Sequence, residues 1–347
     1  MNPIPSRSQL LSERVAPTRL RFSAPVAAAL LVSLAACGGG GDESSGTSGT
    51  NGTRITDQSA AAVMSDAYRA SNALYDSGND AAQTSLDLKG VSRQRKTSMV
   101  DLALQRLEYL AGGGGTSRYV KAVSTDSASC EGGGLITMTI DDADNSGDAS
   151  TGDSARFDFV NCRSEGSVVN GGMSLTGLVM TGGSSDPARS LGATFTFHSV
   201  SVSDGSMVER IDGGFSIHAS LQTYPARIVE STLAGSSLRV SSGGSSSELR
   251  DFALEARSAV SAGTYRYGIG ATVIDSGGAV TISNPEQFSG IIGAFPSSGS
   301  LLVRESGGGA ARLTATSSTS VRIDVVADGD GVFESSMTRT WGEIAGS

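Results

Sequence analysis

Histidine, cysteine and aromatic side chains are scarce in this 347-residue sequence, which has two histidines, three cysteines and 5% aromatic residues. It also lacks a Gly-x-Ser-x-Gly elbow, a His-Glu-x-x-His pair, a phosphate loop and a dinucleotide fingerprint. His198 and His218 lie in alternating patterns whose apolar neighbours point the other way, so both imidazoles are expected on a polar face. We therefore expect a chain that is not an enzyme.

Long hydrophobic runs are missing too, because no apolar stretch reaches the roughly 20 residues that span a bilayer. The main apolar run extends from Ala24 to Ala36 and is interrupted only by Pro25 and Ser33. Arginines precede it and small residues end it, which is the layout of a secretory signal. The chain is therefore expected to be exported.

The end of this run carries the most specific motif in the sequence. Leu34-Ala35-Ala36-Cys37, followed by four glycines, resembles the lipobox of bacterial lipoproteins. The resemblance implies a signal peptide over residues 1–36 and a lipidated Cys37; the alternative is an ordinary signal with a chance cysteine. Gly38 stands where lipoproteins kept in the enterobacterial inner membrane often have Asp, so the resemblance favours the bacterial outer membrane, with the protein periplasmic or surface-exposed.

Positive charge is in deficit once the signal is removed. Residues 1–36 contain four basic side chains and one acidic one, which leaves 22 basic and 34 acidic residues and a net charge of −12. Such a surface repels nucleic acid and anionic headgroups, so neither is expected as a partner. Membrane attachment is expected through the lipid on Cys37.

The mature chain begins with a linker and a helical segment. Residues 37–56 combine the lipidated cysteine with a polar Gly/Ser tether. Residues 57–112 form the helical segment, with one helix predicted over 57–75 and another over 97–110. The first helix has Thr56 or Asp57 as N-cap and an apolar stripe at spacings of three and four, made of Ala60, Val63, Met64, Ala67, Ala70 and Leu74.

Residues 117–347 have the pattern of an antiparallel β domain. Short alternating runs are separated by turn signals such as 170–172, 204–205, 212–214 and 328–331, and no long helix interrupts them. The predicted fold class is mainly β, an antiparallel meander preceded by two short helices, with a curled sheet, a half-barrel and a sandwich all open. The predicted strands cover residues 119–123, 135–141, 155–161, 173–180, 193–202, 214–221, 227–233, 237–240, 248–256, 263–273, 279–282, 300–303, 311–316, 320–326 and 335–341.

Two cysteines remain after Cys37, and in an exported chain Cys130 and Cys162 are expected to form a disulfide. The alternative is two reactive or metal-binding thiols. Their flanks look like two arms of one hairpin with its tip at Ser146, and pairing the cysteines directly sets Ile136 opposite Arg156. A bulge in the glycines 132–134 corrects the side-chain parity, because glycine tolerates a bulge.

An acidic turn between these arms is a candidate calcium loop. Asp142, Asp144 and Ser146 lie at the first, third and fifth positions, Gly147 at the sixth and Asp153 at the twelfth. Asp at the twelfth position has a shorter arm than the usual Glu, and turns select Asp and Gly without any metal. A second, weaker case is 328–331 with Glu334. No cofactor other than this possible Ca²⁺ is expected.

Several motifs together resemble a group of proteobacterial β-rich lipoproteins. The resemblance is carried by 130–134, 152–153, 159–162, 328–331 and Trp341, and it implies no particular activity. Three classes of function remain open. The first is a non-enzymatic binding or structural role in the envelope, with an unknown protein, lipid or glycan as partner. The second is a half-barrel lipid or lipoprotein carrier or chaperone, by loose analogy with periplasmic carriers, and the third is an envelope-polymer hydrolase.

Overall fold

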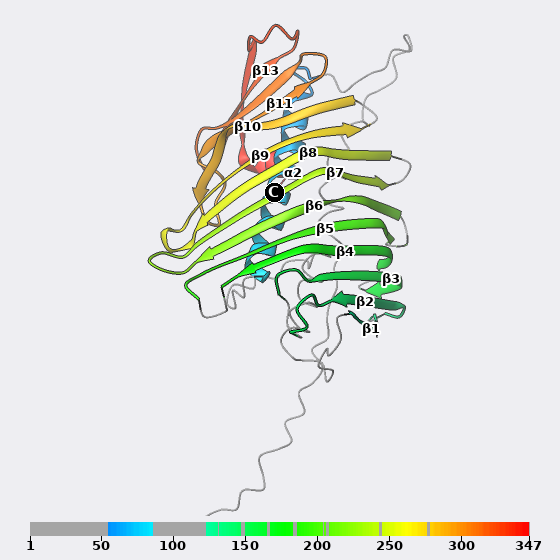
Figure 1. Ribbon diagram of the computed structural model, residues 1–347. Coiled ribbons are helices and arrows are strands. Elements are labelled where there is room, and N and C mark those ends of the chain that lie inside the picture. Colours follow the sequence, from blue (N-terminus) through cyan, green and yellow to red (C-terminus); the bar gives the residue numbers. More distant parts are fainter. Residues whose placement is uncertain are drawn as a thin grey trace, which may run out of the picture.

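The computed structural model describes residues 55–85, 123–130, 132–146, 150–164, 167–182, 186–203, 205, 208–242, 245–275 and 278–346. Its fold is mainly β and consists of one open antiparallel sheet of 14 strands, in which every strand pairs with the next one along the chain (Figure 1). The strands are β1 Val123–Ser129, β2 Leu135–Asp141, β3 Ser154–Ser164, β4 Ser167–Thr181, β5 Ala188–Ser203, β6 Val208–Gln222, β7 Ile228–Ser242, β8 Ser245–Ala259, β9 Thr264–Asp275, β10 Gly278–Ile291, β11 Ser298–Glu305, β12 Ala310–Ala315, β13 Ser320–Val326 and β14 Ser335–Thr340.

The helix α2, Ala60–Ser85, lies across one face of this sheet (Figure 1). All six apolar residues of its predicted stripe are buried, which confirms the helical spacing. The helix begins three residues later than predicted, after a turn in which Thr56 and Ser59 exchange hydrogen bonds, and it continues ten residues beyond Tyr75. The second predicted helix, over 97–110, lies outside the described residues.

The folded body begins before α2. Ile55, which the sequence assigned to the linker, is fully buried, and its N–H donates to Glu305. The folded body therefore includes the last two residues of the predicted linker. Within the described ranges, neither helix has the length and apolar character needed to cross a bilayer.

We call the face of the sheet that packs against α2 the inner face. Aromatic side chains fill it where the C-terminal helix packs. The short helix α4, Trp341–Ala345, begins with a capping box between Thr340 and Glu343 and packs against α2. The Trp341 ring lies 4.6 Å from Tyr68 and is stacked on Phe295, while its Nε1 donates to the carbonyls of Pro296 and Ser317. Both hydrogen bonds satisfy an indole N–H that burial would otherwise leave unpaired.

A line of β-bulges crosses the middle of the sheet, and two Asx-Gly-Gly segments help to build it. The sequence placed Asn170-Gly171-Gly172 and Asp212-Gly213-Gly214 in turns between strands, which is wrong: they lie inside β4 and β6. Each Asx side chain accepts the N–H of a bulged residue at positive φ on the preceding strand, Asn161 for Asn170 and Ser199 for Asp212, at 2.7 Å in both cases. The side chain thus replaces the ladder partner that the bulge removes.

The glycine after each Asx residue is required by a close approach of the next strand. Gly171 and Gly213 have φ near 105°, and a Cβ on either would lie within 2.5 Å of a carbonyl oxygen on the neighbouring strand. Gly235, in β7, has a similar role because a Cβ there would meet the Phe252 ring at 2.4 Å. The predicted break between strands 227–233 and 237–240 is therefore wrong, and β7 runs through it.

The predicted disulfide joins β3 to the residues just before β2. Cys130 and Cys162 are bonded, with their Cα atoms 5.3 Å apart. The register predicted by pairing the cysteines directly is wrong, because Ile136 lies opposite Phe159 and not opposite Arg156.

The glycines after Cys130 explain this shift. Cys130 follows β1 and lies in the tight β1–β2 connection, so the disulfide joins that connection to β3. Gly133 and Gly134 both have positive φ, and a Cβ on Gly134 would lie 1.9 Å from the Asn161 carbonyl oxygen. The glycines therefore correct the side-chain parity by forming the connection itself, and not by a bulge within an arm.

Candidate functional site

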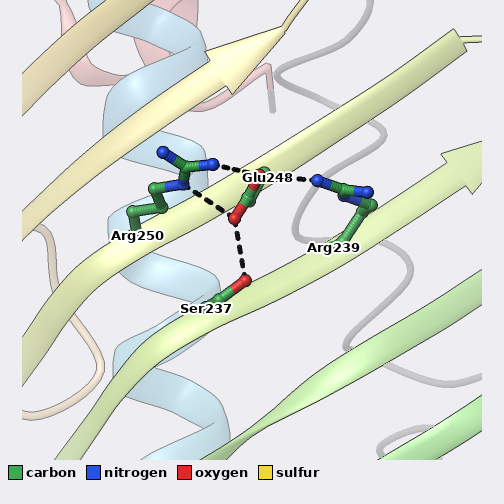
Figure 2. Close-up of polar contacts among 4 residues, drawn as sticks. All are labelled: Ser237, Arg239, Glu248 and Arg250. Carbon is green, nitrogen blue, oxygen red and sulfur yellow. Dashed lines mark hydrogen bonds and ion pairs between the residues drawn. The ribbon is translucent and has the colours of Figure 1, made fainter.

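The outer face of the sheet, opposite α2, carries a compact cluster of charged side chains on β7 and β8. Figure 2 shows Glu248 at its centre, with Arg239 and Ser237 reaching it from β7 and Arg250 from its own strand. Arg250 donates to both carboxylate oxygens, from Nε at 2.8 Å and from Nη2 at 3.0 Å. Arg239 Nη2 and Ser237 Oγ donate at 3.0 and 2.9 Å, so four hydrogen bonds converge on one carboxylate.

Exposure within this Glu248 cluster is uneven. The Glu248 side chain is 10% exposed, whereas the side chains of Arg239 and Arg250 are 58% and 49% exposed. The hydrogen bonds from Arg250, Arg239 and Ser237 lower the pKa of Glu248 from 4.5 to about 2. Because this carboxylate stays ionised at any physiological pH, it is suited to holding two arginines in place and not to acting as a general acid.

A second cluster repeats this arrangement on β12 and β13. Asp324 is buried and accepts hydrogen bonds from Arg312, directly opposite on β12, and from Arg322 two residues earlier on its own strand. The Arg312 guanidinium also lies 4.2 Å from the centre of the Phe333 ring. In both clusters one buried carboxylate orients two arginines, so each leaves a net charge of +1 at the surface.

The two histidines lie on the polar face, as the sequence predicted, and both are exposed. His198 Nε2 is 3.0 Å from Ser174 Oγ, and its charge helps the Arg156 guanidinium to lower the pKa of Asp158. His218 lies opposite Gly192, six residues along β5 from His198 and so roughly 20 Å away. The histidines therefore do not share a site.

The predicted calcium loop does bring its three aspartates together at one end of the hairpin. One carboxylate oxygen from each of Asp142, Asp144 and Asp153 lies within 4.8 Å of the other two, and Asp142 and Asp153 are buried. Two oxygen ligands about 2.4 Å from a Ca²⁺ ion are at most about 4.8 Å apart, so the spacing of the three carboxylates is compatible with one ion. The donor set, three carboxylates, is of the kind that calcium prefers.

Backbone N–H groups already use much of this acceptor capacity. Asp153 accepts from Ala143 at 2.9 Å and from Ser150 at 2.7 Å. The N–H of Ser146 donates to Asp142 and Asp144, so Ser146 closes the turn by donation, and its hydrogen bonds lower the pKa of Asp144. The calcium site therefore stays a prediction, because these hydrogen bonds also explain the aspartates as turn residues.

The second acidic turn is more open. One carboxylate oxygen from each of Asp328, Asp330 and Glu334 also lies within 4.8 Å of the other two, but all three residues are exposed. Each accepts a backbone N–H of its own turn, and the one from Asp330 lowers the pKa of Asp328. This loop behaves as a hydrogen-bonded connection between β13 and β14. Cys37, the predicted lipidation site, lies outside the described residues.

Sequence reasoning missed the Glu248 cluster. Its only local signal is the i, i+2 pair of Glu248 and Arg250, which places both side chains on one face of a strand. The contribution of Arg239 depends on the β7–β8 register. Comparisons of the chain with protein-family models, with curated proteins and with solved structures found no match.

Proposed function

We propose that this chain is an outer-membrane lipoprotein, anchored through Cys37, that binds an envelope partner without catalysing a reaction. The observation that supports this role best is that the two faces of the sheet differ in what covers them. The inner face packs against α2 and α4, whereas the outer face presents polar and charged side chains from neighbouring strands. A broad polar sheet face with ordered arginines suits recognition of a protein or an acidic glycan.

The outer face is ordered by cross-strand hydrogen bonds as well as by the arginine clusters. The hydroxyl groups of Thr194 and Ser216 are 2.8 Å apart, and those of Thr181 and Ser190 are 2.7 Å apart. Side chains fixed in this way lose little conformational freedom when a partner binds. Preorganisation therefore favours binding through this face.

The carrier hypothesis, in which the curved sheet holds an acyl chain on its inner face, has less support. Over β9 and β10 that face is filled by stacked rings: Tyr75 lies 4.6 Å from Tyr267, and Tyr68 packs edge-on against Phe288. A lipid bound there would have to displace α2 from this aromatic core. The hydrolase hypothesis is weakened by the separated histidines and by the ionised Glu248.

Site-specific photocrosslinking tests the proposal in the native, membrane-attached protein. A photoreactive residue is placed at Thr232 or Arg239, both exposed on the outer face, and as a control at Asp330 in the β13–β14 loop. We expect one specific protein or glycan adduct from the outer-face positions and none from the control, identified by mass spectrometry. Adducts that form equally at Asp330, or none at either outer-face position, contradict binding through this face.

A further inference from the structure

Three neighbouring connections at one end of the sheet expose large apolar side chains. They are β6–β7 (residues 222–228), β8–β9 (259–264) and β10–β11 (291–298), and we call them the apolar rim. Tyr224 is 79% exposed, Ile291 67%, Ile292 43% and Val260 39%. Scattered exposed apolar residues are ordinary, but four at the tips of three adjacent loops form a single edge.

Hydrogen bonds fix these three loops to one another. Arg227 donates its N–H to Ser261 Oγ at 2.9 Å, and Val260 donates its N–H to the Arg227 carbonyl at 2.9 Å. Ile292 donates its N–H to the Gly263 carbonyl at 2.9 Å. The apolar tips are therefore held side by side along roughly 20 Å, the width of four strand spacings.

The charge of the apolar rim differs from that of the rest of the chain. Residues 222–230, 257–266 and 289–298 contain three arginines, Arg227, Arg257 and Arg266, and one acid, Glu230, which gives +2 in a chain of net charge −9. At the opposite end of the sheet, residues 305–310 and 326–335 contain four acids and no base. The three loops of the apolar rim are thus apolar and basic, whereas the acidic turns lie elsewhere: 328–331 at the opposite end, and 142–153 at the same end but beyond β4 and β5.

We propose that the apolar rim docks on an anionic lipid surface. Aliphatic tips and a tyrosine enter the headgroup region, where amphipathic rings are favoured. Arg257 is paired with Glu230, so Arg227 and Arg266 are the arginines that face lipid phosphates. The acidic turns 142–153 and 328–331 are repelled by the same surface, so the three rim loops are the part of the molecule that approaches it. The contact alone is weak and reversible, and together with a lipid anchor it fixes how the folded body faces the membrane. This inference uses the loops and their charges and does not rest on the partner proposed for the outer face.

Vesicle binding tests the inference separately from the crosslinking experiment. The purified mature chain, residues 37–347 with Cys37→Ser in place of the predicted anchor, is floated with phosphatidylethanolamine–phosphatidylglycerol vesicles or with phosphatidylcholine vesicles. We expect binding to the anionic vesicles only. Adding Tyr224→Ser and Ile291→Ser should lower the partition coefficient about tenfold or more, because two exposed apolar side chains are lost. The control Val208→Ser, 50% exposed at the opposite end, should leave it within about twofold.

A tryptophan reporter identifies the part of the molecule that meets the lipid. The single native tryptophan, Trp341, is 1% exposed and hidden from lipid quenchers. With Tyr224→Trp, anionic vesicles should shift the emission to shorter wavelength and brominated acyl chains should quench it, while Val208→Trp should show neither effect. Absence of binding, equal loss in the Val208→Ser control, or a response from Val208→Trp and not from Tyr224→Trp each overturns the proposal. Capture of a protein at Tyr224 with no vesicle binding overturns it in favour of a protein partner.

Discussion

Replacing Glu248 with glutamine should destabilise the sheet between β7 and β8. The substitution keeps the size of the side chain but removes the negative charge that Arg239 and Arg250 share. It also turns one acceptor oxygen into an amide nitrogen that faces guanidinium donors. Two like charges are then left side by side on adjacent strands, with a single carbonyl oxygen between them.

The magnitude follows from the pKa and the exposure of the partners. A fall of the Glu248 pKa from 4.5 to about 2 corresponds to at most roughly 3.4 kcal/mol of unfolding free energy. Because both arginine side chains are about half exposed, water screens much of this, and we expect a loss of about 1 to 2 kcal/mol. For a domain of this size that lowers the melting temperature by about 3 to 6 °C.

The pH dependence gives the sharper test. The folded-state pKa is depressed, so the stabilisation is complete above the unfolded pKa near 4.5 and is lost as the pH falls towards 2. The difference in unfolding free energy between wild type and Glu248→Gln, measured by urea denaturation, should therefore shrink from pH 6 to pH 2.5. Glu255→Gln is the matched control, since Glu255 is exposed on the same strand and has no ion pair among the described residues. A gap for Glu248→Gln that stays constant over this range refutes the reasoning.

Four further predictions address other parts of the chain. Replacing Cys130 and Cys162 with serine should cost about 3 to 4 kcal/mol and speed amide exchange in β1–β3 but not in β9–β14; uniform exchange would contradict this. Trp341→Ala should cost about 3 to 5 kcal/mol by urea denaturation, since a buried ring and two hydrogen bonds are lost. If the loop 142–153 binds calcium, free calcium at 100 times its Kd should stabilise wild type by about 2.7 kcal/mol but should not stabilise Asp144→Asn. Identical melts with calcium and with chelator leave only the turn interpretation. Cys37→Ser should move the protein out of the membrane fraction or block signal removal, and unchanged detergent-resistant association would rule the anchor out.

Much of the fold follows from the sequence because alternation along a strand is a local property. The spans of β2 and β13 agree with their predicted ranges, and the alternating runs around Phe195 and Ile217 correctly place one face inside. The antiparallel meander follows because only short connections separate the strands. A strand shorter than its true length was predicted wherever the alternation is interrupted, as in β10, where only 279–282 was expected of Gly278–Ile291.

The interruptions themselves could not be interpreted locally. Asn170-Gly171-Gly172 and Asp212-Gly213-Gly214 have the composition of turns, since Asx tolerates local hydrogen bonding and glycine tolerates positive φ. A mid-strand bulge needs the same two properties, and the choice between turn and bulge depends on the strand that lies alongside. For Asn170 that strand is β3, whose Asn161 N–H it accepts. The sequence therefore indicates where the backbone is irregular without indicating whether the chain reverses there.

The candidate sites also fall into two groups, those that the local sequence reveals and those that depend on strand register. The acidic loop was found because its aspartates lie within twelve residues, and the disulfide because the chain is expected to be exported. The Glu248 cluster and the apolar rim were not found, because both depend on register. Arg239 meets Glu248 only through the β7–β8 pairing, and Tyr224 shares an edge with Ile291 only because six strands lie in sequence order.

That strand order also keeps three parts of the protein independent of one another: the outer face, the core and the apolar rim. In a meander the side chains of successive residues alternate between the inner and outer faces, while the connections all lie at the two ends. A substitution in one of these parts therefore requires no change in the other two. Glu248 represents the outer face, Trp341 the core and Tyr224 the apolar rim. Single substitutions should accordingly separate outer-face binding, core stability and lipid contact. If a substitution at Tyr224 also abolished the outer-face crosslinks, partner binding would require the membrane-docked orientation.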